Sequence, residues 1–202
     1  MEPLKAGLLA DMIPTEAQEY INNSGVTRSN VDLAFNWIFK FSEVTCVLSG
    51  MNSMEMLEEN IEIANNHKNN PLSRDELHVI KVVKKIIKRL NKIDCTSCNY
   101  CMPCPQNVNI PDIFKLYNDK YLFPENKMMG INASLANYTT NVLGFVGENR
   151  DVSLCTNCGE CLGKCPQQLN IPDLLNDVDK EFHGRWIRPI VPVAKKIMGK
   201  FL

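Results

Sequence analysis

The sequence lacks a long hydrophobic run free of charge, and it lacks a strong net charge of either sign. Its most apolar window, residues 31–50, is interrupted by Asp32, Lys40 and Glu43, so we expect no transmembrane segment. The first twenty residues show no basic stretch followed by an apolar core, so no secretory signal is indicated. A formal net charge of −1 gives no overall attraction to nucleic acid, and we expect none as a partner.

Cysteine is nearly absent outside two short stretches. Eight of the nine cysteines lie between residues 95 and 104 and between residues 155 and 165. Without a signal for export, disulfides are disfavoured, and a reducing, cytoplasmic location is expected. The clustered thiols are then more typical of metal ligands. The ninth, Cys46, stands alone in a short β-branched run, and we expect it to be a buried apolar residue.

The two cysteine-rich stretches are copies of one pattern. Each has three cysteines with two residues between neighbours, followed by a Cys-Pro pair, and the copies are offset by 60 residues, or by 61 at the last cysteine. Two copies indicate a duplicated site rather than a solenoid, which needs three or more repeats. The first cysteine run is Cys95, Cys98, Cys101 and Cys104, and the second is Cys155, Cys158, Cys161 and Cys165.

This pattern predicts two [4Fe–4S] clusters. A cubic cluster takes four thiolates, and in two-cluster proteins of this type the last cysteine of each run ligates the other cluster. We therefore expect Cys165 to join the first three cysteines of the first run, and Cys104 to join those of the second. Zinc is the disfavoured alternative, because zinc sites usually combine two Cys-x2-Cys pairs. The first run has two residues before its last cysteine where the usual spacing is three, which leaves open whether that site holds a complete cube.

Helix signals surround both runs. Ser73 and Glu76 form a predicted capping box, and apolar residues follow at helical spacing up to Leu90, so one helix should lead directly into the first run. After each run, Asn109 or Asn170 is a predicted N-cap with proline in the first turn. Each site should therefore also be followed by a helix, with mixed helix and loop between the sites.

The first seventy residues predict an alternation of helix, strand and helix. Helices are expected from Thr15, over residues 30–41 and over residues 53–66, and a short strand over residues 44–50. One short strand cannot form a sheet, so this part of the chain looks incomplete by itself.

The segments that contain the cysteines resemble the C-terminal domain of ferredoxin-containing aldo/keto reductases, in which an α-helical ferredoxin domain follows a TIM barrel. Upstream, residues 1–10, 32–41 and 44–64 are similar to the segment leaving that family's seventh strand, its seventh helix, and its eighth strand and helix. The resemblance implies a mainly α chain: an α-helical ferredoxin-like dicluster domain (69–181), preceded by a partial (β/α) barrel fragment (1–68) and followed by a basic amphipathic tail (182–202).

The same resemblance implies a remnant of a nicotinamide nucleotide site. Glu59 and Asn60 match the pair that meets the adenine end of the cofactor, and Ser49 and Gly50 lie in the turn that meets its phosphate. This turn carries no basic residue for a 2′-phosphate, which disfavours NADPH. A solvated helix face is the alternative for Glu59 and Asn60.

No catalytic residue of the family's barrel is present, so the resemblance implies the electron-transfer part of an oxidoreductase rather than a reductase. A fragment or subunit of a complete aldo/keto reductase-type enzyme is the alternative. Expected partners are an electron donor or acceptor protein and a barrel subunit or a missing N-terminal half.

Two basic segments remain open to two interpretations each. Residues 81–92 carry five lysines and Arg89, which indicates a solvated helix face, or alternatively a docking surface for an acidic electron partner. The tail combines basic and apolar residues around Pro189 and Pro192, which favours docking onto protein over an interfacial helix.

Overall fold

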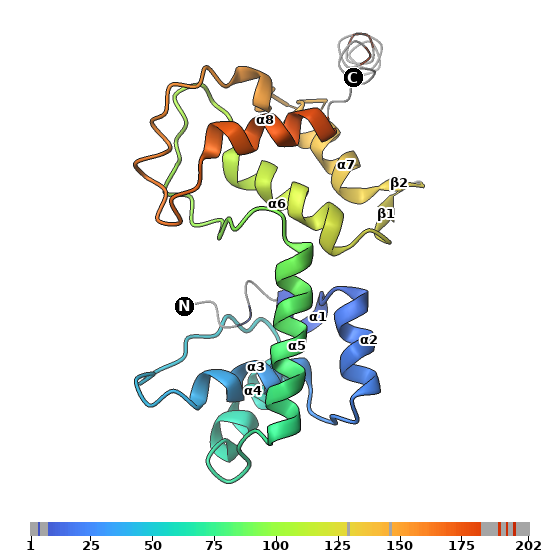
Figure 1. The fold of residues 1–202 in the computed structure, drawn as a ribbon, viewed down its shortest axis with the longest axis vertical. Helices are drawn as coiled ribbons and strands as arrows, with labels where there is room; N and C mark the ends of the chain where they lie inside the picture. The colour runs from blue at the N-terminus through green and yellow to red at the C-terminus, as the bar shows by residue number, and fades with distance from the viewer. Residues whose placement is uncertain are drawn as a thin grey trace. The chain divides into compact units, whose positions relative to one another are not determined.

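The computed structural model describes residues 4, 8–128, 130–145 and 147–182, together with the single positions 190, 193 and 196. The chain divides into two compact units, Met1–Arg89 and Leu90–Leu202 (Figure 1). The sequence placed a boundary at residues 68 and 69, whereas the structure assigns the following long helix to the first unit. The predicted tail lies outside the described residues apart from Phe182 and the three single positions.

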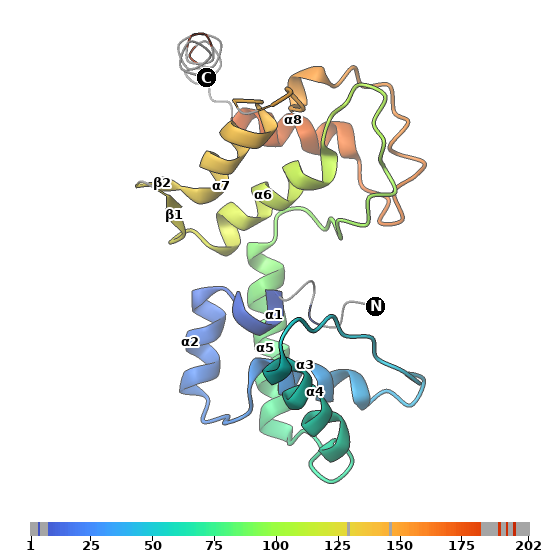
Figure 2. The ribbon, with the colours of Figure 1, turned by 180° about the vertical axis from the view of Figure 1, so that it is seen from behind.

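The first unit is built from helices that follow one another along the chain (Figures 1 and 2). Helix α3 packs against both α1 and α4. The buried apolar residues of the unit include Ala17, Leu33, Phe35, Ile63 and Val79. The helices are α1 (Leu8–Asp11), α2 (Thr15–Asn23), α3 (Asn30–Phe39), α4 (Met54–Asn66) and α5 (Arg74–Leu90).

Side-chain caps fix where three of these helices begin. The Ser73 hydroxyl accepts from the Glu76 backbone N–H at 3.2 Å, and the Glu76 carboxylate accepts from the Ser73 N–H at 2.7 Å. The predicted capping box of α5 is therefore confirmed. Ser29 and Ser53 cap α3 and α4 in the same way with their hydroxyls, which satisfies backbone donors that have no partner within the helix.

The predicted strand over residues 44–50 is wrong. These residues form no regular element, and Val44 and Leu48 are 39% and 61% exposed. Cys46, which was expected to be buried, is exposed as well. A strand needs a neighbouring strand to pair its backbone groups, and the described residues of the first unit contain none. The predicted barrel fragment is therefore not observed.

The second unit is mainly helical, which confirms the predicted class. It also holds a small antiparallel pair of strands that the sequence did not predict, with Lys127 opposite Asn132. Within the described part of the chain, no helix has the length and apolar character needed to cross a membrane. The elements are α6 (Ile110–Leu122), β1 (Lys127–Met128), β2 (Ile131–Asn132), α7 (Ala133–Asn137), the π-helical turn η1 (Tyr138–Val142), the 3-10 turn η2 (Val152–Leu154) and α8 (Ile171–Phe182).

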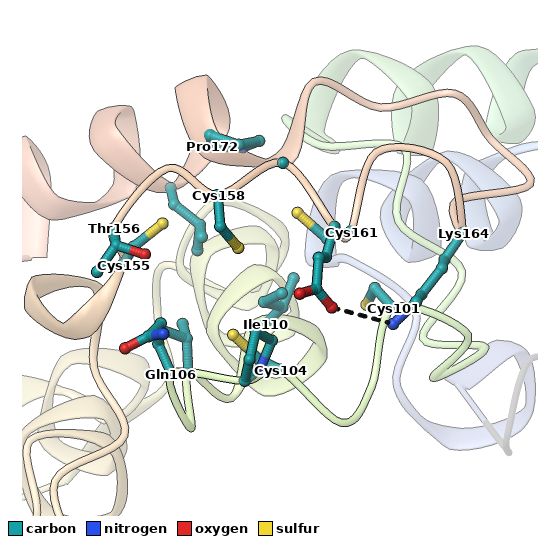
Figure 3. A pocket seen from close by; sticks show the side chains of 15 residues that line it. Cys101, Cys104, Gln106, Ile110, Cys155, Thr156, Cys158, Cys161, Lys164 and Pro172 are labelled. Carbon is teal, nitrogen blue, oxygen red and sulfur yellow. Dashed lines mark ion pairs between the residues drawn. The ribbon is translucent and has the colours of Figure 1, made fainter.

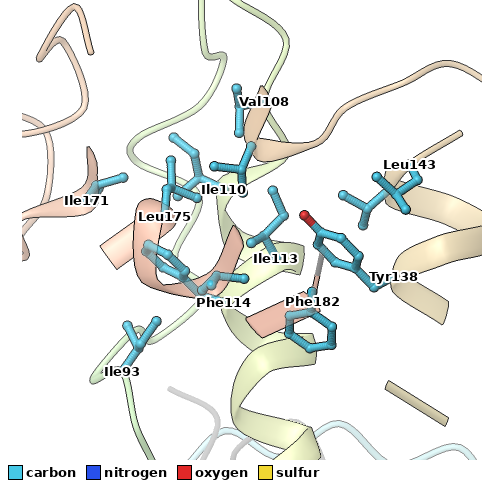
Figure 4. Packing of buried hydrophobic residues seen from close by; sticks show 13 residues of the cluster. Ile93, Val108, Ile110, Ile113, Phe114, Tyr138, Leu143, Ile171, Leu175 and Phe182 are labelled. Atoms are coloured by element: carbon cyan, nitrogen blue, oxygen red, sulfur yellow. The ribbon is translucent and has the colours of Figure 1, made fainter. Parts of the chain in front are cut away.

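Helices α6 and α8 form the centre of the second unit. Each begins directly after a cysteine run and turns a stripe of apolar side chains toward the other (Figure 4). The Tyr138 and Phe182 rings stack at 4.7 Å between centroids beside this pair. At the edge of the pair, the Glu181 carboxylate of α8 accepts hydrogen bonds from the Tyr117 and Tyr121 hydroxyls of α6 at 3.1 and 2.6 Å. This core supports the segments that carry the cysteines.

Candidate metal centre

Buried polar side chains hold the backbone just before each cysteine run. The Asn118 side chain of α6 accepts from the backbone N–H groups of Lys92 and Ile93 at 3.0 and 2.9 Å, and it donates to the Ile93 carbonyl at 2.8 Å. Asp151 accepts from the Ser153 N–H at 3.0 Å and so caps η2, which ends just before Cys155. Sequence reasoning missed both residues, because nothing in their sequence context distinguishes them from ordinary surface polar residues.

The two runs share the same backbone conformation. Residues with positive φ recur at matching positions: Ser97 and Asn157 at 53° and 56°, and Asn99 and Gly159 at 63° and 77°. Left-handed residues turn the chain sharply between successive cysteines, and Asn and Gly adopt this conformation at little cost. At the start of the first run, the Ser97 N–H donates to the Cys95 sulfur at 3.4 Å. The sequence repeat is therefore also a structural repeat.

One cavity, called here the first cavity, collects cysteines from both runs. Three of them belong to the first run and Cys165 comes from the end of the second. Apolar side chains including Phe114 and Ile171 complete the wall, and the empty volume is about 340 Å³, including space open to solvent. The cysteines that line it are Cys95, Cys98, Cys101 and Cys165.

The second cavity has the complementary set. The sulfurs of Cys104, Cys155, Cys158 and Cys161 surround a common space (Figure 3), with an empty volume of about 400 Å³ that includes space open to solvent. Cys101 also lines this cavity, so it lies between the two. Unlike the first cavity, the second has charged residues in its wall, Glu160 and Lys164, whose charged groups lie 3.8 Å apart.

The cysteines differ in their exposure and in their acidity. Cys98 and Cys158, the middle cysteine of each Cys-x2-Cys-x2-Cys segment, are exposed, whereas the other six are half-buried. Burial, followed by the neighbouring Cys95 thiol, raises the pKa of the Cys101 thiol to about 11. Burial also raises the pKa of Cys95 and of Cys161. Metal ligation needs thiolates. Binding of a metal or cluster at these sites therefore releases the protons that the half-buried thiols otherwise hold.

The thiol arrangement fits a group larger than one ion. Among the residues that the structure describes, no three His, Cys, Asp or Glu side chains converge as they would around a single metal ion. Each cavity nevertheless has four thiols of the predicted set in its wall, and soft thiolates are the ligands that iron–sulfur clusters take. The residues therefore fit a [4Fe–4S] cluster, which supplies one-electron transfer when bound.

Comparison with known families agrees with this chemistry. Residues 94–171 match the family of 4Fe-4S dicluster domains. No curated protein and no solved structure matches the chain. The matched stretch contains both cysteine runs, α6 and the start of α8, so the second unit carries a ferredoxin-like iron–sulfur domain of the 4Fe–4S type.

The residues expected at a nucleotide remnant lie in the first unit. The Asn60 side-chain amide donates to the Ser49 hydroxyl at 3.3 Å, and the Glu59 carboxylate accepts from the Ser29 hydroxyl at 2.7 Å. Glu59 also lines a polar cavity that includes Arg28. Around Gly50, a Cβ would meet no atom within 4 Å. The structure thus brings Ser49 and Asn60 together, whereas Gly50 makes no close approach.

Proposed function

We propose that this chain is an electron-transfer protein with two [4Fe–4S] clusters and crossed ligation. The supporting observation is that each cavity has three cysteines of one run and the last cysteine of the other in its wall. In this assignment the first cluster is held by Cys95, Cys98, Cys101 and Cys165, and the second by Cys155, Cys158, Cys161 and Cys104.

The chain's own residues hold the clusters and shield them. Half-buried thiols pack against the apolar core of α6 and α8, which limits water around the sulfur atoms and influences the reduction potential. Since Cys101 lines both cavities, it would lie between the two clusters. All nine thiols are free, which suits a reducing cytoplasm. The expected partners are an electron donor and an electron acceptor.

Metal analysis of chain purified without oxygen tests this proposal. We expect about eight iron and eight acid-labile sulfide per chain, little zinc, and electron paramagnetic resonance signals of reduced [4Fe–4S] clusters. About four iron per chain would reduce the proposal to one cluster, and would point to the short spacing before Cys104 as the cause. Stoichiometric zinc without sulfide would overturn it in favour of a structural zinc protein.

A second candidate function is supported by the exposed apolar surface of the first unit. Six large apolar side chains between positions 44 and 61 are exposed, and apolar side chains that a partner covers are typical of an interface. We infer that this chain is a part or a subunit of a larger aldo/keto reductase-like enzyme whose barrel covers these side chains. The exposed residues are Val44, Leu48, Met51, Met54, Met56 and Ile61, at 39% to 64% exposure.

The mass of the protein in its source cells separates the two candidates. An antibody raised against residues 95–175 should detect a species much larger than 22.9 kDa, or a stable complex, if a barrel accompanies the chain. A free species of 22.9 kDa would favour the independent electron carrier. In the larger enzyme, Ser49, Gly50, Glu59 and Asn60 would face a nicotinamide nucleotide, and binding of NADH and NADPH to the complex, measured calorimetrically, tests this part.

A further inference from the structure

Each cavity has one exposed cysteine, and the surroundings of the two differ. Cys98 and Cys158 occupy the same position in the repeat and are both exposed. An exposed ligand is the point at which an electron has the shortest path from a cluster to a bound partner. The side chains around these two cysteines therefore decide where partners dock.

The loop at Cys98 is uncharged and has an exposed aromatic ring. No charged residue occurs between Asp94 and Asp112, and Tyr100 is 67% exposed. The repeat offset of 60 places Glu160 at the position equivalent to Tyr100, and Glu160 forms an ion pair with Lys164. The duplicated site thus has an aromatic surface at one exposed cysteine and a charged surface at the other.

We propose that residues 96–100, with Tyr100 as the main contact, form the docking surface for a redox protein whose cofactor is surrounded by an uncharged, apolar face. A charged partner face would lose water against this loop without gaining an opposite charge, which is unfavourable. Tyrosine contributes strongly to interfaces because its ring buries a large area at a small cost in conformational entropy.

This inference rests on the proposed function, because it needs a cluster beside Cys98. In the transfer, one electron leaves the reduced cluster and reduces the partner's cofactor, and no bond is formed or broken. The flanking Asn99 has a φ of 63°, a left-handed conformation that turns the chain sharply between Cys98 and Cys101.

Electron transfer to rubredoxin tests the proposal, because this small iron protein has an uncharged surface over its metal. The reduced, cluster-loaded chain is mixed with oxidised rubredoxin, and the second-order rate is followed by stopped-flow absorption. We expect Tyr100→Ala to lower the rate about tenfold and Tyr100→Phe to keep it within about twofold, since the ring remains. Benzoquinone, which is small enough to reach both exposed cysteines, should be reduced at the same rate by all variants.

Ile131→Ala is the matched control, because it removes another exposed apolar side chain of the second unit that lines neither cavity. It should leave the rubredoxin rate unchanged, and the rate should vary little with salt. A Tyr100→Ala rate equal to that of the unsubstituted chain, or an equal loss in Ile131→Ala, would overturn the proposal. A transfer rate that depends steeply on salt and falls in the Lys84→Glu/Lys88→Glu variant would also overturn the proposal, because it would assign the docking surface to α5.

The cluster content of each sample, read from its visible spectrum before mixing, separates this test from that of the proposed function. A chain without clusters overturns the proposed function and this inference with it. A chain with full cluster content whose transfer rate does not change on Tyr100→Ala overturns the docking surface alone.

Discussion

Cys165 lines the same cavity as Cys95, although the two residues come from opposite ends of the repeat. This relationship joins the copies, because neither cysteine run by itself supplies all four thiols of one cavity. If the cavities hold clusters, each cluster links both cysteine runs. The loss of one cluster should therefore destabilise the backbone of both runs.

Paired cysteine substitutions distinguish crossed from uncrossed ligation. With crossing, Cys98→Ala/Cys165→Ala removes two ligands of one cluster and leaves the other complete, so about half of the iron should remain. Cys98→Ala/Cys104→Ala damages both clusters and should lose nearly all of it. Iron analysis and electron paramagnetic resonance measure the outcome. The opposite ranking of the two variants would show that each run ligates its own cluster.

Asn118→Ala should destabilise the start of the first cysteine run. The substitution leaves the N–H groups of Lys92 and Ile93 and the Ile93 carbonyl without their buried partner. We expect the free energy of local opening, measured by hydrogen exchange of these amides, to fall by about 2–3 kcal/mol. Iron release to a chelator should be faster as well. Lys115→Ala, at an exposed position of the same helix, is the control, and an equal effect there would contradict the role of Asn118.

Gly144→Ala should destabilise the second unit. Gly144 has a φ of +70°, and a Cβ there would lie 2.6 Å from backbone atoms of Glu148 and Asn149. Because those atoms cannot move as a flexible side chain could, we expect a loss of about 2 kcal/mol or more. Hydrogen exchange at Arg150, whose N–H donates to the Val142 carbonyl at 2.9 Å, measures it. Gly163→Ala is the control, since a Cβ there meets nothing within 4 Å.

Glu76 should make the stability of the first unit depend on pH. The guanidinium of Arg28 donates to Glu76 at 2.7 Å and to Asp32 at 2.9 Å. Burial by itself would raise the pKa of Glu76, but hydrogen bonds from Ser73 and Arg28 outweigh it and hold the pKa below its ordinary value. A carboxyl with a lowered pKa stabilises the fold above its ordinary value of about 4.3, and this contribution is lost as the pH falls through the lowered pKa.

We therefore expect Glu76→Gln to cost about 2 kcal/mol at pH 7, and the difference from the unsubstituted chain to shrink below about pH 4.3. Trp37 lies in α3, so its fluorescence during urea unfolding reports on this unit once Trp186 is replaced by Phe. Glu58→Gln, at an exposed position of α4, should have little effect at either pH. A difference between Glu76→Gln and the unsubstituted chain that is constant down to pH 3 would exclude this role for the carboxylate.

Local signals in the sequence predicted the helices that flank the cysteine runs, because each signal depends on a few neighbouring residues. The Ser73 and Glu76 pair determined the start of α5, and α6 and α8 begin within the Asn-x-Pro segments after each run. The predicted N-cap Asn109 makes no side-chain cap hydrogen bond to α6 and instead donates to the Asp112 carboxylate. The strand predicted over residues 44–50 was wrong because a strand depends on residues far away in the chain. β-branched residues favour a strand, but a strand exists only where another strand satisfies its backbone groups.

The sequence by itself determined the chemistry of the site. Eight thiols at these spacings specify iron–sulfur ligation through ligand type and number, which folding does not alter. The repeat also predicted which thiols belong together, but only the tertiary structure brings them into one cavity, since α6 and α8 must pack together before Cys165 can lie beside the first run. It also decided that Asn118 is buried and that Tyr100 is exposed, because burial depends on contacts between residues far apart in the chain.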